Sequence, residues 1–113
     1  MVKDKFNKDK DKDNVSIDFV FDNNGDYIYT DSAYGFGKKV NIHGKITTPE
    51  DGIYSAEIIS SDGGGGRWNN VKANEEIACI INTSILHKTT LKVIIHSNKP
   101  NCNGYAVIDY YVG

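Results

Sequence analysis

The chain has 113 residues, of which 39% are hydrophobic and 25% charged, values typical of one folded domain with a buried core. The net charge is −2 and the lysines gather near the N-terminus, which argues against a nucleic-acid-binding protein, since such proteins normally present a basic face. No apolar run approaches the roughly 20 residues of a membrane span. We therefore expect no nucleic-acid partner and no transmembrane segment.

The first 14 residues predict a segment distinct from the rest of the chain. Lys, Asp and Asn alternate there with a single aromatic residue, and such a tract cannot bury enough apolar area to offset its ordering entropy. We interpret residues 1–14 as a flexible charged tail or tether and residues 15–113 as the domain. The many Lys, Asn and Ile residues, against the single Arg67, suggest an AT-rich genome, with a low-GC bacterium favoured over a protist or a virus.

The remaining chain reads as short strands separated by turns. Apolar and polar residues alternate over Val15–Phe21, a pattern typical of a half-buried strand, and no segment longer than one turn keeps the 3.6-residue period of a helix. We expect seven or eight strands in one antiparallel β-sandwich, of jelly-roll or immunoglobulin-like topology. The further strands are expected at Tyr27–Tyr29, Val40–Ile46, Tyr54–Ile58, Arg67–Val71, Ile77–Ile81, Leu91–Ile95 and Tyr105–Val112, with an irregular loop over Asp31–Lys39.

The motifs of common enzyme classes are absent from the sequence. An enzyme needs a nucleophile with its base, or a pair of tuned carboxylates, and no G-x-S-x-G or H-E-x-x-H segment occurs. The four glycines Gly63–Gly66 are not followed by the G-K-[ST] of a phosphate-binding loop. We predict a protein that is not an enzyme; a metal-dependent enzyme without a recognisable motif is the second alternative.

One turn carries oxygen ligands that could bind a metal ion. Asp22, Asn24 and Asp26 lie close together in sequence, and Ca²⁺ accepts flexible sets of carboxylate and carbonyl oxygens. The favoured interpretation is an ordinary Asx turn, in which Asp and Asn side chains bond the local backbone. The three histidines are scattered singly, unlike the grouped ligands of zinc sites. No cofactor is expected, with calcium as the single candidate.

Two cysteines leave two readings open. Cys79 lies within an apolar strand and Cys102 within a turn rich in Asn and Gly. They are either one buried and one exposed free thiol, or a disulfide, which would require an exported protein and suitable Cα separation.

The aromatic residues are the best lead to a function. Trp68 follows the glycine run and is flanked by Arg67, Asn69 and Asn70. An indole ring can stack on the apolar face of a sugar while amide and guanidinium groups bond its hydroxyls. Tyr34 and Phe36 lie in the irregular loop and join the candidate ligand-binding set. The alternative is that Trp68 fills the core, since tryptophan is highly buried on average.

Two stretches resemble known binding modules. Thr47–Tyr54, with its P-x-x-G-x-Y turn, and the strand Asn103–Val112 resemble parts of bacterial jelly-roll binding modules. The glycine run before Trp68, the Val71-Lys72 step and the late G-[FY] strand resemble the small component of Pir-type binary insecticidal toxins, over roughly residues 40–112. That resemblance implies a jelly-roll that recognises a receptor or glycan beside a larger protein partner acting on membranes.

These features together predict a secreted or cell-surface module, of bacterial origin, that binds a glycan or a cell-surface receptor through loop aromatics. The first alternative is a component of a binary toxin, or another subunit that binds a larger protein partner. Because the strands carry almost no chemistry, we expect the site in the loops around Tyr34 and Trp68.

Overall fold

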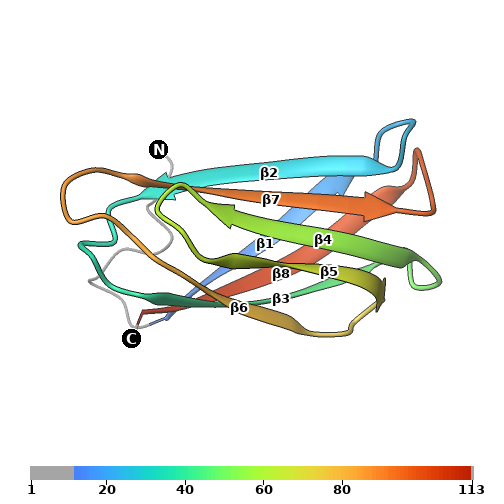
Figure 1. Cartoon of the computed structure of the whole chain (residues 1–113). Helices are drawn as coiled ribbons and strands as arrows, with labels where there is room; N and C mark the ends of the chain where they lie inside the picture. Colours follow the sequence, from blue (N-terminus) through green and yellow to red (C-terminus); the bar gives the residue numbers. More distant parts are fainter. Residues whose placement is uncertain (1–11, 113) are drawn as a thin grey trace.

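The computed structural model describes residues 12–112, with side chains from Asn14 to Tyr111. It contains eight strands and no helix within that range (Figure 1), which confirms the predicted all-β sandwich. The strands are β1 (Lys12–Val20), β2 (Asp26–Ala33), β3 (Val40–Thr48), β4 (Ile53–Ser60), β5 (Gly65–Lys72), β6 (Ile77–Ile81), β7 (Thr89–Ser97) and β8 (Asn103–Val112).

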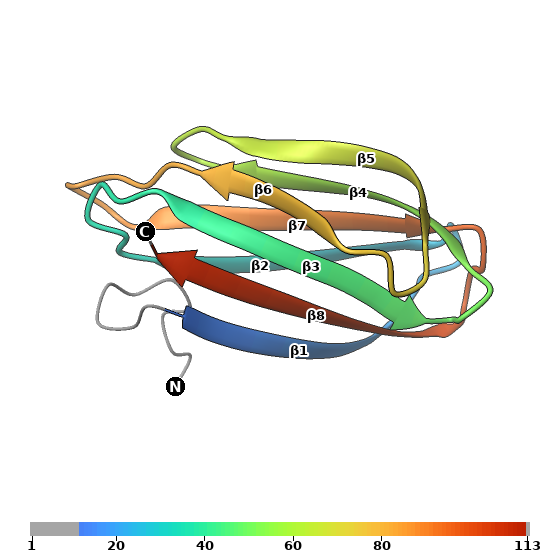
Figure 2. The same ribbon diagram turned by 90° about the horizontal axis from the view of Figure 1, so that it is seen from below.

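The strands form two four-stranded antiparallel sheets that face each other. Their orders are β1-β8-β3-β6 and β2-β7-β4-β5, and Figure 2 shows the first of these sheets lying in front of the second. The pairs β4·β5, β3·β6, β2·β7 and β1·β8 are nested within one another along the chain. This nested pairing is that of a long hairpin rolled into two layers, so the topology is a jelly-roll and not immunoglobulin-like.

The core lies between the two sheets and follows the alternation of each strand. In β7, every second residue from Thr89 to Ser97 is buried, as expected for a strand with one face against a core. Four aromatic rings gather where β1 ends and β4 begins. Phe19 stacks on Tyr27 with 4.1 Å between ring centroids, Phe21 meets Phe19 edge-on at 4.9 Å, and Phe21 lies 6.0 Å from Tyr54. We call these four residues the aromatic cluster.

Several strands extend one or two residues beyond the predicted bounds, and two extend further. β1 begins at Lys12, inside the segment interpreted as a tail, because its pairing with β8 continues to Lys12 opposite Tyr111; residues 1–11 of that predicted tail lie outside the described residues. β2 continues to Ala33, into the predicted loop over Asp31–Lys39, because Asp31 and Ala33 both face inward.

The glycine run is tightly packed against neighbouring backbone. Gly65 and Gly66 already belong to β5, and Gly64 forms an isolated bridge to Ile81 of the opposite sheet. Gly65 has a φ of 114°, and a Cβ there would lie 2.0 Å from the carbonyl oxygen of Ile58. Glycine is therefore required where the β4–β5 connection crosses close to β4 and β6.

The jelly-roll gathers its connections at two opposite ends (Figure 1). The turn end holds residues 21–25, 49–52, 73–76 and 98–102. The loop end, on the left of Figure 1, holds residues 34–39, 61–64 and 82–88. The side chains predicted to bind a ligand lie at the loop end and along β5.

Candidate functional site

Trp68 lies within a strand and points toward the core. Its half-buried ring packs against the hydrophobic core cluster, and a Cβ at Gly66 would lie 2.9 Å from that ring. The alternation of β5 turns Arg67 and Asn69 outward and Trp68 inward. Trp68 therefore lies in the strand expected over Arg67–Val71 and not in a loop beside it, and its placement agrees with the core-filling alternative.

A β-bulge explains the position of the two asparagines. Tyr54 pairs with Val71 and Ala56 with Trp68, so Asn69 and Asn70 together oppose the single residue Ser55. Asn70 takes a φ of 56°, the left-handed conformation that asparagine tolerates better than most residues. The extra residue lets Trp68 and Val71 both face inward while Asn69 stays on the outer surface.

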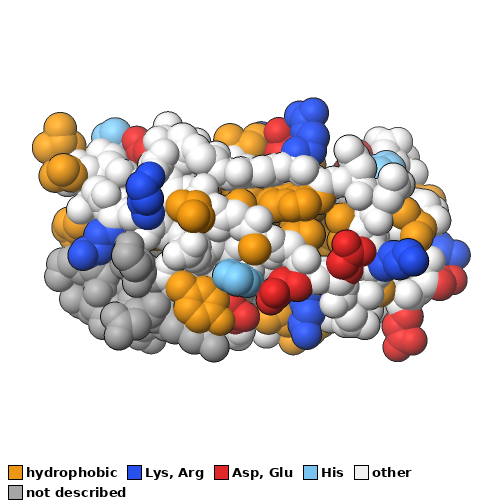
Figure 3. All heavy atoms as spheres, turned by 60° about the horizontal axis from the view of Figure 1, so that its bottom comes forward, with side chains coloured by type: hydrophobic (Ala, Val, Ile, Leu, Met, Phe, Trp, Pro, Cys, Tyr) orange, Lys and Arg blue, Asp and Glu red, His pale blue; other side chains and the backbone are white. Residues whose placement is uncertain are grey.

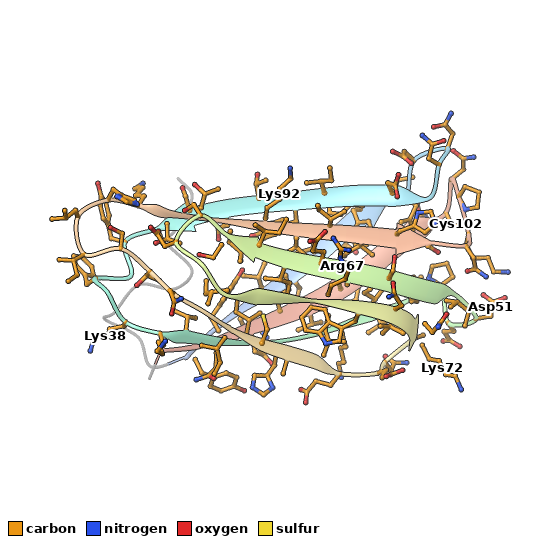
Figure 4. The ribbon with its side chains drawn as sticks, in the orientation of Figure 1. Lys38, Asp51, Arg67, Lys72, Lys92 and Cys102 are labelled. Atoms are coloured by element: carbon orange, nitrogen blue, oxygen red, sulfur yellow. The ribbon has the colours of Figure 1, made fainter. Side chains whose placement is uncertain are left out.

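Arg67 and Asn69 line a hollow on the outer face of the β2-β7-β4-β5 sheet, which we call the face pocket. Its volume is about 260 Å³ and its remaining lining comes from Ser55, Ala56, Glu57 and Ile94. Arg67 Nη2 donates a hydrogen bond of 3.0 Å to Glu57 Oε2. Figure 4 shows Arg67 near the middle of the sheet, away from both ends. The pocket therefore combines a guanidinium, a carboxylate, an amide and a hydroxyl beside one aliphatic side chain.

The register places two aliphatic side chains next to each other at the face pocket. We call these two residues, Ile28 and Ile94, the aliphatic strip. Ile28 of β2 pairs with Ile94 of β7, Ile94 with Glu57 of β4, and Glu57 with Arg67. Because directly paired residues lie on the same face of a sheet, all four side chains share the outer surface. Along this row of paired residues, the outer face thus changes from the aliphatic side chains of β2 and β7 to the charged side chains of β4 and β5.

Tyr34 and Phe36 lie at the loop end, separated from the face pocket in the fold. They are 41% and 43% exposed, and their ring centroids are 5.9 Å apart at an interplanar angle of 31°. Backbone and side-chain hydrogen bonds fix their connection to residues 82–88. Gly37 N donates to Ser84 O at 3.1 Å, and Thr83 Oγ1 donates to Lys38 O at 2.7 Å. The predicted set is therefore divided between two surfaces.

Sequence reasoning missed two exposed aliphatic residues at the same end. Ile85 and Leu86 of the β6–β7 connection are 73% and 88% exposed, the largest values among the exposed large hydrophobic residues of the described chain. The available signal was an apolar pair inside a connection whose other residues are all polar, where turn residues are expected to be polar.

A second missed feature is a hydrogen-bonded network around Asp62. His87 Nε2 lies 3.0 Å from Asp62 Oδ1, and His87 Nδ1 lies 3.2 Å from Ser84 Oγ. Thr89 Oγ1 donates to Asp62 Oδ2 at 2.6 Å. That hydrogen bond, aided by His87, holds the pKa of Asp62 below its ordinary value, although burial opposes the shift. Asp62 lies 25 residues from His87 and 27 from Thr89, so no local sequence pattern indicates this network.

The Ser84–His87–Asp62 contacts stabilise the loop. The backbone N–H groups of Leu86 and His87 donate to Ser84 Oγ at 3.0 and 3.2 Å, so both acceptor positions of that oxygen are occupied. A nucleophilic hydroxyl needs a lone pair directed at its substrate. The arrangement in the structure is that of a polar turn tied to β4–β5.

The turn predicted as a calcium candidate has the geometry of an Asx turn. Asp22 Oδ1 accepts hydrogen bonds of 2.9 Å from the N–H groups of Asn24 and Asp26. Asp26 Oδ1 lies 2.7 Å from His96 Nδ1. Within residues 12–112, no group of three or more His, Cys, Asp or Glu side chains is arranged to hold a metal ion. Calcium binding at this turn stays an expectation.

Both cysteines are free. Cys79 lies in β6 and Cys102 in the connection before β8. Burial raises the pKa of the Cys79 thiol to about 11. The reading as free thiols therefore describes the structure, but the expected contrast of one buried and one exposed thiol is wrong, since both cysteines are partly buried.

Several solved structures match this chain, and they include the following two. One is the carbohydrate-binding module TmCBM61, solved in complex with β-1,4-galactotriose, at a TM-score of 0.50 and 10% identity, over 94% of this chain and 83% of that one. The other is the P-domain of Macrobrachium rosenbergii nodavirus, at a TM-score of 0.43 and 13% identity, over 90% of this chain and 93% of that one.

Sequence comparison adds no relative. No family model and no curated protein matches the chain, so the resemblance to the Pir-type component gains no support from it. In the described part of the chain, no helix is long and apolar enough to cross a membrane. At 10% identity, the likeness to TmCBM61 shows a shared β-sandwich fold and leaves the function to be argued from the side chains.

Proposed function

We propose that the protein is a non-enzymatic module, secreted or attached to a cell surface, that binds a glycan in the face pocket. The observation that carries the proposal is the grouping of Arg67, Glu57, Asn69 and Ser55 around one open hollow of about 260 Å³. These side chains offer donors and acceptors on neighbouring strands, which is what the many hydroxyls of a sugar require.

The ion pair in the pocket favours a neutral polar ligand. Glu57 accepts from one guanidinium nitrogen of Arg67, which balances the local charge and holds the planar guanidinium in place. Its remaining N–H groups can donate to neighbouring hydroxyls in a fixed fork geometry. Ile94 supplies an aliphatic surface for the apolar face of the ring. The β-sandwich TmCBM61, with which this chain shares its fold, was solved with a galactotriose bound, which adds support.

A glycan array followed by calorimetric titration of the best ligand tests this assignment. Arg67→Ala should weaken binding by about tenfold or more and Asn69→Ala by about fivefold, because a bond to a charged group contributes about 1.5–3 kcal/mol and a neutral one about 1. Lys92→Ala is the matched control, an exposed cation on the same sheet face outside the pocket. Phe36→Ala is the second control, at the loop end.

The outcomes separate the two surfaces. If Phe36→Ala abolishes glycan binding and Arg67→Ala leaves it intact, the site lies on the loop aromatics and the face pocket is the wrong assignment. If no glycan binds to the unaltered protein, the function itself is wrong.

A second candidate function is that of a subunit that binds a larger protein partner, as the Pir-type resemblance implies. The specific observation in its favour is the aliphatic strip beside the face pocket, with Ile28 51% exposed. Protein interfaces are most apolar at their centre. Co-purification from the source organism, with the unaltered protein and with Ile28→Asp, tests it. A partner that co-purifies with the unaltered protein but not with Ile28→Asp supports the interface. An unaltered protein that purifies as a monomer with no partner contradicts it.

A further inference from the structure

We propose that the loop end docks the protein on a lipid bilayer that contains anionic lipids. The contact surface, which we call the apolar tip, consists of Tyr34, Phe36, Ile85 and Leu86. The connections that carry it also contain three lysines. The inference is independent of the face pocket and assigns a partner to the aromatic residues that the pocket does not use.

The apolar tip exposes far more apolar surface than a turn normally does. Leu86 is 88% exposed and Ile85 73% exposed, beside the two exposed aromatic rings. Figure 3 shows hydrophobic side chains protruding at the left of the molecule, which is the loop end. A patch of this kind, on a connection where polar residues would serve equally well, is typical of an interaction site.

Hydrogen bonds hold the tip in a form that presents these side chains outward. Gly37 N donates to Ser84 O at 3.1 Å, which joins the two connections that carry the aromatic and the aliphatic residues. Ser84 Oγ accepts from the N–H groups of Leu86 and His87, and a Cβ at Gly37 would lie 2.6 Å from the Ile85 side chain. Little ordering of the backbone is therefore needed on binding.

The charge around the tip selects for an anionic partner. The three connections of the loop end contain Lys38, Lys39 and Lys88 but a single acid, Asp62, which bonds His87 and Thr89. The chain as a whole carries −2, so these lysines form a basic region on an acidic protein. Lys88 Nζ also lies 5.6 Å from the centroid of the Tyr34 ring, which brings charge and apolar surface together.

A bilayer fits this combination better than a protein pocket does. The side chains of the tip protrude from the molecule (Figure 3), and a lipid interface accepts apolar side chains without a pocket of complementary shape. Lysine side chains can extend past such residues to reach headgroup phosphates, and tyrosine is favoured at the boundary between headgroups and acyl chains. Stable attachment of a peripheral protein takes two signals, and here they are an apolar insertion and the lysines of the same connections.

Co-sedimentation with vesicles tests the inference, with phosphatidylcholine alone compared with phosphatidylcholine mixed with phosphatidylserine. We expect binding to the mixed vesicles that falls as NaCl rises from about 0.1 M to about 1 M, because the Debye length shortens from about 10 to about 3 Å. Leu86→Ser should reduce binding at least tenfold, and Lys88→Ala by about fivefold. Ile80→Ser is the matched control, since Ile80 is 50% exposed on β6 and is not one of the four residues of the tip.

Every outcome of these binding measurements either supports or overturns the proposed membrane contact. Loss of binding with Leu86→Ser but not with Ile80→Ser supports the proposal, as does unchanged vesicle binding by Arg67→Ala, which alters only the face pocket. The proposal is overturned if the unaltered protein fails to bind mixed vesicles, if it binds both kinds of vesicle equally, or if Ile80→Ser is as damaging as Leu86→Ser. Unchanged thermal unfolding of the Leu86→Ser protein shows that the fold is intact.

Discussion

The two ends of the sandwich use aromatic residues in opposite ways. Near the turn end, the aromatic cluster of Phe19, Phe21, Tyr27 and Tyr54 is packed into the interior. At the loop end, Tyr34 and Phe36 lie outside, each more than two-fifths exposed. The same residue type therefore closes the core at one end and forms a surface at the other.

Polar side chains are hydrogen-bonded at both ends, but only those at the loop end support exposed apolar residues. At the turn end, Asp22 bonds the local backbone and the Lys99 Nζ–Asp51 Oδ2 distance is 3.1 Å, so the turns are polar and satisfied. At the loop end, the Asp62 network is equally well bonded, but it supports a connection whose tip is aliphatic. Exposed apolar residues above a well-ordered polar base point to a surface that is held in place for contact.

The largest expected effect tests this contrast through two phenylalanines. Phe21→Ala should lower the free energy of unfolding by about 3–5 kcal/mol, because it empties a fully buried site in the aromatic cluster. Phe36→Ala should change it by no more than about 0.5 kcal/mol, as is usual for surface substitutions. Urea unfolding of both variants measures the difference, and equal effects would mean that the two ends are not distinct.

The first glycine of β5, directly after the loop end, should be nearly as sensitive as the core. Gly65→Ala forces a side chain into a backbone with a φ of 114° and places its Cβ 2.0 Å from Ile58 O, so we expect a loss of about 1–3 kcal/mol. Gly44→Ala is the matched control, because its φ is not positive and its nearest contact would be 3.4 Å away. Thermal unfolding compares the two variants. A Gly65→Ala protein as stable as the control would show that the β4–β5 connection can shift to accommodate a side chain.

The base of the loop end can be weakened without altering its tip. Thr89 is fully buried, donates to Asp62 and accepts from Ser84 N at 3.0 Å. Thr89→Val keeps the shape but leaves that N–H without its partner and removes the shorter of two hydrogen bonds to Asp62 Oδ2, which should cost about 1–3 kcal/mol. Hydrogen exchange should become faster at residues 84–88 and stay unchanged at 21–25 of the turn end. Faster exchange at both ends would contradict the separation of the two.

The smallest expected effect depends on pH. The pKa of Asp62 is lower in the folded protein than in the unfolded chain, since Thr89 and His87 bond its charged form. Its stabilising contribution is therefore complete above the unfolded pKa of about 3.9 and is lost as the pH falls through the folded value. Asp62→Asn should remove this acid dependence from the exchange rates of residues 84–88. Identical pH profiles for both proteins would exclude Asp62 as the cause.

The sequence was sufficient for the fold class and insufficient for the topology. Alternation in segments such as Val15–Phe21 and the short β-branched runs after Ile77 predicted strands, and the structure confirms them. The choice between jelly-roll and immunoglobulin-like topology depends on which strands pair at long range, as with Ile17 and Ala106. Local alternation carries no information about partners, so this choice lay beyond sequence reasoning.

The candidate site was predicted in part, for reasons visible in single residues. Trp68 was expected in a strand over Arg67–Val71 but was grouped with the loop aromatics, because the glycines before it look like a linker. Gly65 is needed for close packing, and the strand already begins there. Tyr34 and Phe36 do lie in an exposed connection, as expected. Leu86 was overlooked because two aliphatic residues form no period, and Asp62 because its partners lie 25 and 27 residues away.

The nested strand pairing has a consequence for how the chain folds. β4 and β5 are joined by a short connection and can pair early, whereas Lys12 of β1 pairs with Tyr111 of β8, almost at the other end of the chain. Pairing between such distant residues makes folding slow. β8 also occupies an inner position between β1 and β3. During synthesis, both of those strands wait with open edges until the final strand arrives, and this interval is when the chain is most exposed to aggregation and most in need of a chaperone.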